Sequence, residues 1–336
     1  MSRYFYKQPT LGVGTFLMSM FMQNRECENG YRNAQEEVQL MNTRFNAINQ
    51  NLEQSEVAQR YLLPHVSSFL HPFIDPMPSP LHEDWGYSVS IFFDTKTGKP
   101  VIPFFYAPNL FSDHFVKLTT DDPHFCFFHF DDENQSTISP AMQKARTNFV
   151  KSPCKKTERE RMEKFICQHE AKHINALHLA WLMAATAVLT SLNVMLIAHF
   201  VKTKNFRRLF PVGLLSAINY GVALNEYADQ IHAVTSTPFT MSNPGVLQFM
   251  LTQKLARSFE IAADRFAIQQ TVLQNSPDEA EKILQAAQSF HAIRHDFGKH
   301  PFFASHPSNE ERLHVIEREL VRLEEKKRSV ASPGNK

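Results

Sequence analysis

The chain has 336 residues, which is enough for about two domains. Hydrophobic residues make up 43% of the chain and charged residues 21%, so a disordered, collagen-like or low-complexity chain is excluded. The 35 Lys and Arg residues nearly balance the 34 Asp and Glu residues, and no basic field is present to attract nucleic acid. We therefore expect a globular protein without a nucleic-acid partner.

Residues 1–80 are predicted to form a helical region that ends in a proline-rich linker. The uncharged run from Thr10 to Met22 has the length of a signal-peptide core, but it is short for a membrane span and no Ala-x-Ala cleavage pattern follows it. We expect an ordinary apolar segment there. Apolar side chains step by three and four along residues 33–58, which predicts an amphipathic helix. Five prolines between 64 and 80 exclude an α-helix and indicate a linker.

Residues 81–150 are predicted to be rich in β structure. The stretch Tyr87–Phe93 alternates in part, Asp94–Gly98 is a plausible turn, and Val101–Tyr106 predicts the returning strand. Phe125–Phe130 is a further aromatic strand candidate. No residue pattern in this region indicates a particular chemistry.

The pattern becomes helical from about residue 155 and contains the motif His169-Glu170-Ala-Lys-His173. Histidines at i and i+4 share one helical face, so both imidazoles can bind one metal ion. Zinc suits such a site because it accepts nitrogen and oxygen ligands, and Glu170 can take a proton from a metal-bound water. Among chains of this length and composition, with 16 His, roughly one in twenty would contain such a motif by chance. Alone, it is only suggestive.

A third metal ligand is needed from elsewhere in the chain, and Glu260 is the best candidate. Glu260 and Asp264 lie at i and i+4 in a segment without a helix breaker, so Glu260 can bind the metal while Asp264 holds a ligand histidine. The alternative is a solvated helix face on which Arg257 and Arg265 neutralise the two acids. Glu226 is a weaker competitor for the third ligand.

Three motifs occur in one order and together resemble a known family. They are His169–His173 with His178 following, then Arg257–Ala267, then Ser305–Arg312. The set is similar to that of the zinc endopeptidases of the HtpX heat-shock protease and CAAX prenyl protease type. The resemblance covers about residues 155–326, and the first 150 residues show none.

This resemblance implies a role for each matching residue. His169, His173 and Glu260 would bind one zinc ion per chain, Glu170 would be the general base, and Asp264 would orient a ligand histidine. The fold implied is a zincin-like metallopeptidase domain. Together with the residue patterns, this predicts a mainly α protein with a transmembrane helical hairpin, preceded by an α+β N-terminal region.

The last motif adds two candidate catalytic residues. By the resemblance, His306 would help to stabilise the tetrahedral intermediate, which needs a donor besides the metal, and Arg312 matches the arginine that follows it. The alternative for His306 is a turn before a helix over 308–326. The substrate-binding edge strand of the family has no recognisable counterpart, although residues 87–106 could supply one.

An apolar hairpin is predicted over residues 174–225. No Asp, Glu, Lys or Arg occurs from Ile174 to Val201, which is long enough for a membrane span. A basic loop follows, and a weaker uncharged run over 209–225 would return the chain to its starting side. The alternative is a pair of buried helices in a soluble domain, because several Ser, Thr and Asn residues weaken the membrane signal.

These observations predict four regions: 1–80, 81–150, the zinc metallopeptidase domain 151–328, and a tail over 329–336. We expect a zinc-dependent endopeptidase in a multi-pass integral membrane protein, in contact with the lipid bilayer. Its substrates would be proteins or peptides, and its role protein processing or quality control. The alternatives are a catalytically silent relative that binds a client, and a membrane scaffold in which the motif is accidental.

Overall fold

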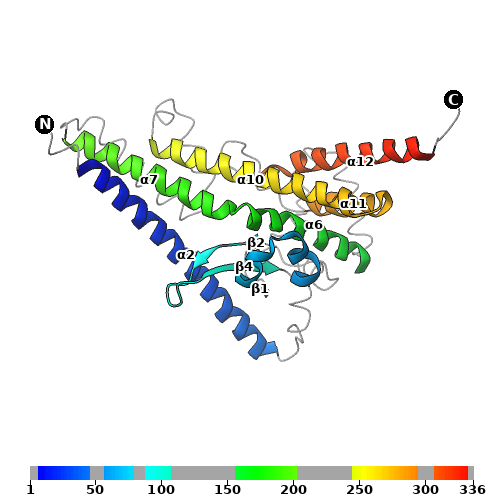
Figure 1. The fold of residues 1–336 in the computed structure, drawn as a ribbon, viewed down its shortest axis with the longest axis horizontal. Coiled ribbons are helices and arrows are strands. Elements are labelled where there is room, and N and C mark those ends of the chain that lie inside the picture. Colours follow the sequence, from blue (N-terminus) through cyan, green and yellow to red (C-terminus); the bar gives the residue numbers. More distant parts are fainter. Residues whose placement is uncertain are drawn as a thin grey trace, which may run out of the picture. The chain divides into compact units, whose positions relative to one another are not determined.

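The computed structural model describes residues 7–45, 57–78, 88–106, 156–202, 244–293 and 306–331 (Figure 1). These residues fall into two compact units. Unit 1 contains the described residues 7–27, 178–202, 244–258 and His306, and unit 2 contains 28–45, 57–78, 88–106, 156–177, 259–293 and 307–331. The predicted fold class is confirmed, because the structure is mainly α-helical with one small β region.

Unit 2 contains a group of helices packed around one apolar cluster. They are α6 (Lys156–Asn175), the second half of α10 (Pro244–Gln274), α11 (Pro277–Ile293) and α12 (Asn309–Ala331). Each helix contributes fully or nearly fully buried side chains to the cluster, including Phe165, Ile268, Ile283, Leu284 and Ile316. The predicted helix over 308–326 is confirmed by α12.

Both later helices begin where side chains satisfy their free backbone N–H groups. Ser276 Oγ accepts from Glu279 N at 3.3 Å at the start of α11. At the start of α12, Ser308 Oγ accepts from Glu311 N at 3.2 Å while Ser308 N donates to the Glu311 carboxylate at 3.1 Å. That reciprocal pair is a capping box, and it fixes where the first turn of α12 begins.

A small sheet packs on α6 through a second apolar cluster. Strand β4 (Pro100–Tyr106) lies between β1 (Ile74–Pro78), which is parallel to it, and β2 (Ser88–Val89), which is antiparallel, and β3 (Phe92–Phe93) also pairs with β4. The cluster joins buried residues of β4, the preceding turns and α6, namely Ile102, Phe104, Tyr106, Leu62, Leu70, Cys167, Ala171 and Ile174. Helix α6 is therefore held by apolar clusters formed with the sheet and with the other helices.

Some predictions for the N-terminal region are confirmed and one is wrong. The strands and the turn over 94–98 are confirmed, with Gly98 at a φ of 65° and its N–H bonded to Asp94 O at 2.8 Å. The stretch 64–80 was predicted to be a linker, and this is wrong for residues 74–78, which form β1. A strand at the end of a sheet tolerates prolines because one side of it needs no ladder hydrogen bonds. Short turns η1 (Ala58–Leu62), η2 (Leu63–His65) and η3 (Ser68–Phe73) precede β1.

Helix α2 (Lys7–Phe45) contains both the apolar run and the first part of the predicted amphipathic helix. Residues 46–56, 79–87 and 107–155 lie outside the described residues, and with them the strand candidate 125–130. The boundaries of the four predicted regions stay a prediction. Strands β1 and β4 lie on opposite sides of the boundary predicted at residue 80, and they pair with each other.

In unit 1, the first half of α2 packs against α7 (His178–Lys202). Gln23 Nε2 donates to Met183 O at 3.3 Å, and Gly12 lies against Met195. Within α7, His178–His199 is the one stretch of the described residues that is long and apolar enough to cross a membrane, with a mean hydropathy of 1.8. The second predicted run, 209–225, lies outside the described residues.

Candidate metal centre

Helix α6 places the two histidines of the motif side by side. His169 and His173 are one turn apart, their ring centroids lie 4.9 Å apart, and the two Nε2 atoms are 3.1 Å apart. His169 and Glu170 are both buried. The helix ends shortly afterwards, where Leu177 adopts a positive φ of 49°. The motif therefore lies near the C-terminal end of a helix that is fixed by packing.

Glu260 on α10 completes a group of three donors. Its Oε2 lies 3.4 Å from His169 Nε2, and its Oε1 lies 3.4 Å from His173 Nε2. One ligand atom from each of the three residues lies within 4.8 Å of the others. Ligands bound tetrahedrally at the usual zinc distances would be about 3.3 Å apart. The donor set therefore fits a zinc ion both in chemistry and in spacing, while the competitor Glu226 lies outside the described residues.

Asp264, one turn further along α10, lies behind the first histidine. Its Oδ1 is 2.8 Å from His169 Nδ1, although no described donor is well aligned on that oxygen. The short distance and the burial of both groups favour a charge-assisted hydrogen bond that leaves Nε2 free to bind a metal. Burial opposes the charged imidazolium, but Asp264 and Glu260 outweigh it and raise the pKa of His169. A metal ion would replace that proton, since a ligand histidine must be neutral.

Arg312 joins the two carboxylates from the first turn of α12. Its Nη2 donates to Glu260 Oε2 at 2.6 Å, and its Nε lies 3.4 Å from Asp264 Oδ2. Burial alone would raise the pKa of Asp264, but the charge of Arg312 and the bond to His169 lower it to about 2. The arginine is only 5% exposed, so this is a buried ion-pair network with little screening by solvent.

The structure brings six of the seven predicted site residues into unit 2: His169, Glu170, His173, Glu260, Asp264 and Arg312. The seventh, His306, is half-buried and belongs to unit 1. Its role therefore stays a prediction.

A polar pair next to the first ligand histidine was not predicted. Thr271 Oγ1 donates to Gln168 Oε1 at 2.8 Å, and both side chains are fully buried. This bond links α6 to α10 beside His169, so it helps to hold the two ligand helices together. The sequence contains no signal for it, because a lone Gln and a lone Thr 103 positions apart form no motif.

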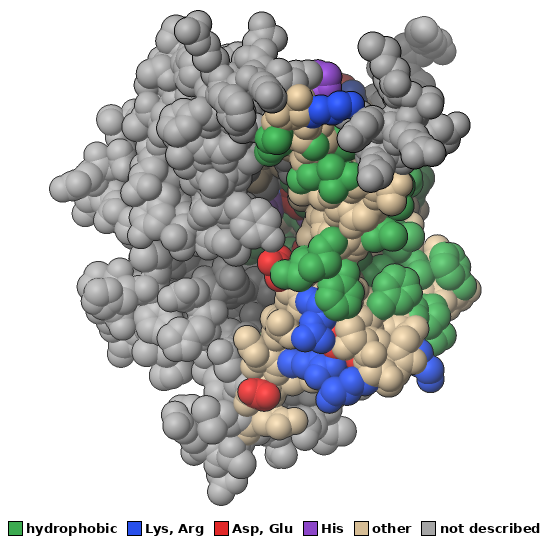
Figure 2. Space-filling view, turned by 90° about the vertical axis from the view of Figure 1, so that its left-hand side faces the viewer, with side chains coloured by type: hydrophobic (Ala, Val, Ile, Leu, Met, Phe, Trp, Pro, Cys, Tyr) green, Lys and Arg blue, Asp and Glu red, His purple; other side chains and the backbone are tan. Residues whose placement is uncertain are grey.

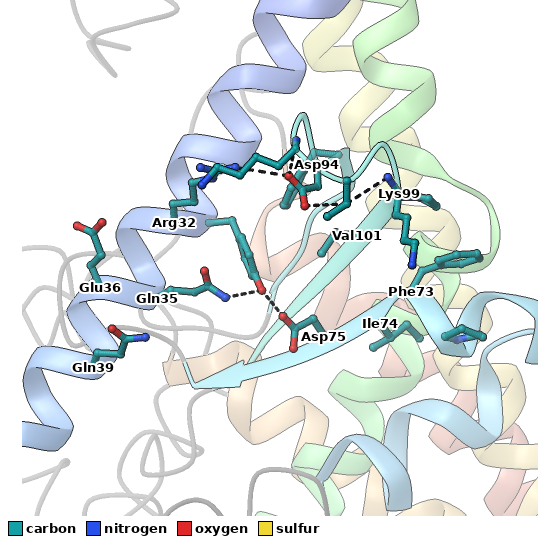
Figure 3. Close-up of a pocket in the computed structure, with 16 residues that line it drawn as sticks. Arg32, Gln35, Glu36, Gln39, Phe73, Ile74, Asp75, Asp94, Lys99 and Val101 are labelled. Atoms are coloured by element: carbon teal, nitrogen blue, oxygen red, sulfur yellow. Dashed lines mark hydrogen bonds and ion pairs between the residues drawn. The ribbon is translucent and has the colours of Figure 1, made fainter.

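A cavity of about 1070 Å³ lies elsewhere in unit 2, between α2 and the strands. Figure 3 shows Arg32 pointing to Asp94. The Tyr31 hydroxyl donates to the Asp75 carboxylate and accepts from Gln35 Nε2 at 2.6 Å. None of the metal-ligand candidates lines this cavity. Its charged side chains mainly tie α2 to the strands.

Comparison with known proteins supports the metal site. Residues 154–320 match the model of peptidase family M48. No curated protein and no solved structure matches the chain significantly. The family match agrees with the resemblance to peptidases of the HtpX and CAAX protease type, and it covers every one of the six clustered residues. The chain therefore carries a metallopeptidase domain of family M48 over residues 154–320.

Proposed function

We propose that the chain is a zinc-dependent endopeptidase whose metal is bound by His169, His173 and Glu260. The observation that carries the proposal is the group of two imidazole nitrogens and one carboxylate, at most 15% exposed and spaced 3.1 and 3.4 Å apart. Two histidines and one glutamate are a common catalytic zinc set, because they leave a position for water or substrate. When bound, zinc would lower the pKa of a water molecule and polarise the scissile carbonyl.

The side chains around this position would move protons and hold the ligands in place. Glu170, next to His169 on α6, would take a proton from the attacking water and pass it to the leaving amine. Asp264 would keep His169 in the tautomer that binds metal through Nε2. Arg312 would fix the carboxylate of Glu260, which makes it a positioning residue. His306 would supply a hydrogen bond to the developing oxyanion, as the family resemblance implies.

The substrates would be proteins or peptides, and the site would work at a membrane. Helix α7 supports the membrane location, since its apolar stretch is 22 residues long and only 17% of its most apolar window is buried. A core helix of a soluble protein would be mostly buried. Quality control or processing of membrane proteins follows as the proposed role, in a multi-pass protein whose second crossing was expected over 209–225.

A catalytically silent scaffold is the second candidate. It would retain the fold and bind a client without cleaving it. The complete set of ligands, base and supporting groups speaks against it, because a domain that no longer cleaves its clients would not need all of these residues to stay intact.

Zinc analysis and turnover of the purified full chain test the proposal. Wild type should contain about one zinc per chain, and the double variant His169→Ala/Glu260→Ala should contain none. Glu170→Gln should keep its zinc and lose 10²- to 10⁴-fold of its activity on a peptide library, roughly the usual value of a general base. Glu310→Gln, an exposed acid on α12, serves as the matched control.

The outcomes separate the candidates. Cleavage retained in Glu170→Gln would remove that residue from the mechanism. Zinc without cleavage in wild type would favour the silent scaffold. Wild type that binds no zinc at all would overturn the enzyme proposal.

A further inference from the structure

Helix α6 and the second half of α10 meet along a row of polar side-chain pairs, which we call the polar row. The pairs, in their order along α6, are Lys164–Asn275 at 2.6 Å, Gln168–Thr271 at 2.8 Å, His169–Asp264 at 2.8 Å and His173–Glu260 at 3.4 Å. Rising numbers on α6 meet falling numbers on α10, so the two helices are antiparallel. The metal-ligand group is therefore one end of a longer polar contact between these helices.

A short segment outside the matched peptidase domain bonds to this polar row. His65 is the last residue of η2, and its Nε2 lies 3.4 Å from Gln168 Nε2. Asn175, at the end of α6, donates from Nδ2 to His65 O at 2.7 Å and accepts from Ser67 N at 2.8 Å. The neighbouring Leu62 is fully buried in the apolar cluster that α6 shares with the sheet. Polar and apolar contacts therefore fix this segment on α6.

The hydrogen bonds of Gln168 determine the state of the His65 ring. Gln168 Oε1 accepts from the Thr271 hydroxyl, so the amide N–H of Gln168 points to the imidazole. His65 Nε2 must then accept a hydrogen bond, which requires a neutral ring. Burial and the charge of Lys164 both lower the pKa of His65, in agreement with a neutral ring at pH 7. The other ring nitrogen faces the exposed side chain of Gln274.

Loss of the acceptor at His65 would reach the metal-ligand group through Gln168. Gln168 and Thr271 are fully buried, so an unpaired amide N–H there is costly and the amide would turn away from Thr271 to find another partner. Gln168 directly precedes His169 on α6, and Thr271 lies about two turns beyond Asp264 on α10. Metal sites are sensitive to such changes, because losing a group that supports a ligand weakens metal binding roughly 10- to 100-fold.

We infer that His65 is a positioning residue for the metal centre, which holds Gln168 in the orientation that joins the two ligand helices. The inference rests on the proposed function, because it concerns the same zinc site. In this role His65 contacts neither metal nor substrate. The peptidase domain matched over residues 154–320 thus depends on a segment of the N-terminal region. The sequence gives no sign of this, because a lone histidine in a proline-rich stretch forms no motif.

Three substitutions of His65 separate the hydrogen bond from simple packing. His65→Gln places an amide oxygen at about the reach of Nε2, His65→Asn is one carbon shorter, and His65→Leu fills space without an acceptor. His71→Leu is the matched control, because His71 lies in the next turn, η3, and its Nε2 bonds to Val66 O at 2.9 Å within the same segment. Hydrophobic side chains gather on the described part of the face in Figure 2, so all full-length proteins would be purified in one mild detergent.

Metal affinity and metal spectroscopy supply readouts that do not depend on turnover. Zinc affinity would be measured by competition with a chelator, and the visible absorption of the Co²⁺-loaded protein would report the geometry of the ligands. His65→Leu and His65→Asn should bind zinc about tenfold more weakly than wild type and change the Co²⁺ spectrum. His65→Gln and His71→Leu should match wild type in both. A role in packing alone would favour Leu over Gln and leave the spectrum unchanged.

The outcomes distinguish this inference from the proposed function. Wild-type affinity and spectrum in His65→Leu, or an equal change in His71→Leu or His65→Gln, would overturn the inference and leave the zinc site in place. Wild type that binds neither Zn²⁺ nor Co²⁺ would overturn both. In a Gln168→Leu background, His65→Leu should weaken zinc binding little further, because its effect passes through Gln168. A full additional loss in that background would refute this route.

Discussion

Replacing Arg312 by Met should destabilise the protein strongly even though the residue contacts no substrate in the proposed mechanism. The guanidinium donates to Glu260 at 2.6 Å and lies 3.4 Å from Asp264. Met fills a similar volume but compensates neither carboxylate. The variant would therefore leave two buried acids close together, which is the costly outcome when one partner of a buried ion pair is removed.

The magnitude follows from Asp264 and the burial of the network. Burial alone would raise the pKa of Asp264, yet it falls from an ordinary 3.8 to about 2, chiefly through Arg312 and then His169. A pKa shift of one unit corresponds to about 1.4 kcal/mol, so the lowered pKa of Asp264 corresponds to roughly 2 kcal/mol of folding free energy at neutral pH. Removing one partner of a buried pair costs about 3–5 kcal/mol in other proteins, and a total loss of about 2–5 kcal/mol is expected.

Urea denaturation of the metal-depleted protein would measure this loss of unfolding free energy. A zinc titration of the same protein would then measure metal binding. Arg318→Met is the matched control, because Arg318 is exposed on the same helix and bonds to a backbone carbonyl of its own helix. Arg312→Lys keeps the charge without the forked geometry and should fall between wild type and Arg312→Met. A loss in Arg312→Met no larger than that in Arg318→Met would refute the argument that the ion-pair network stabilises the fold.

Three further predictions concern the support of the site. Thr271→Val should lower the unfolding free energy by about 1–3 kcal/mol, because it leaves the Gln168 oxygen buried and unpaired. In urea denaturation, the double variant Gln168→Leu/Thr271→Val should lose less than the sum of the losses of the two single variants. Leu177→Asn should raise stability by about 0.5–1 kcal/mol, because Asn adopts a φ of 49° more readily than Leu, whereas Leu177→Ala should show no such gain. The bond from Arg161 lowers the pKa of Glu279, so its stabilisation is present at neutral pH and is lost as pH falls below 4.5. Glu279→Gln should be about 0.5 kcal/mol less stable than wild type at pH 7. Thermal melts of the two proteins should become similar in acid.

The donor set was predictable from the sequence because its spacing is local. His169 and His173 lie on one face of a helix by periodicity alone, and so do Glu260 and Asp264. What spacing could not predict is that α6 and α10 face each other, because that depends on side chains far apart in the chain, such as Phe165 and Ile268. The family resemblance supplied that missing step.

The role of Arg312 shows a different limit. Its position after the His-Pro pair suggested a catalytic residue, while the structure shows it bonded to Glu260 and Asp264. The capping box formed by Ser308 and Glu311 is readable in the sequence as a helix start, and it places Arg312 one turn into α12. The sequence thus indicates where Arg312 sits on its helix but not which carboxylates it meets.

The charges around the site give an independent reason to expect a divalent metal. Glu170, Glu260 and Asp264 contribute three carboxylates to a region where side chains are at most 15% exposed, and Arg312 contributes one positive charge. With both histidines neutral, as ligands must be, the three carboxylates outnumber the one guanidinium among these side chains. Buried charge is tolerated only when it is paired or binds a metal. Asp264 and Glu260 raise the pKa of His169, so a proton on this histidine relieves part of the imbalance when no metal is bound. A zinc ion between Glu260 and the two Nε2 atoms would supply positive charge at the point where the donors converge. Arg312 belongs to the site for the same reason, because it pairs with Glu260 and Asp264 and not with the two histidine Nε2 atoms that a metal would bind.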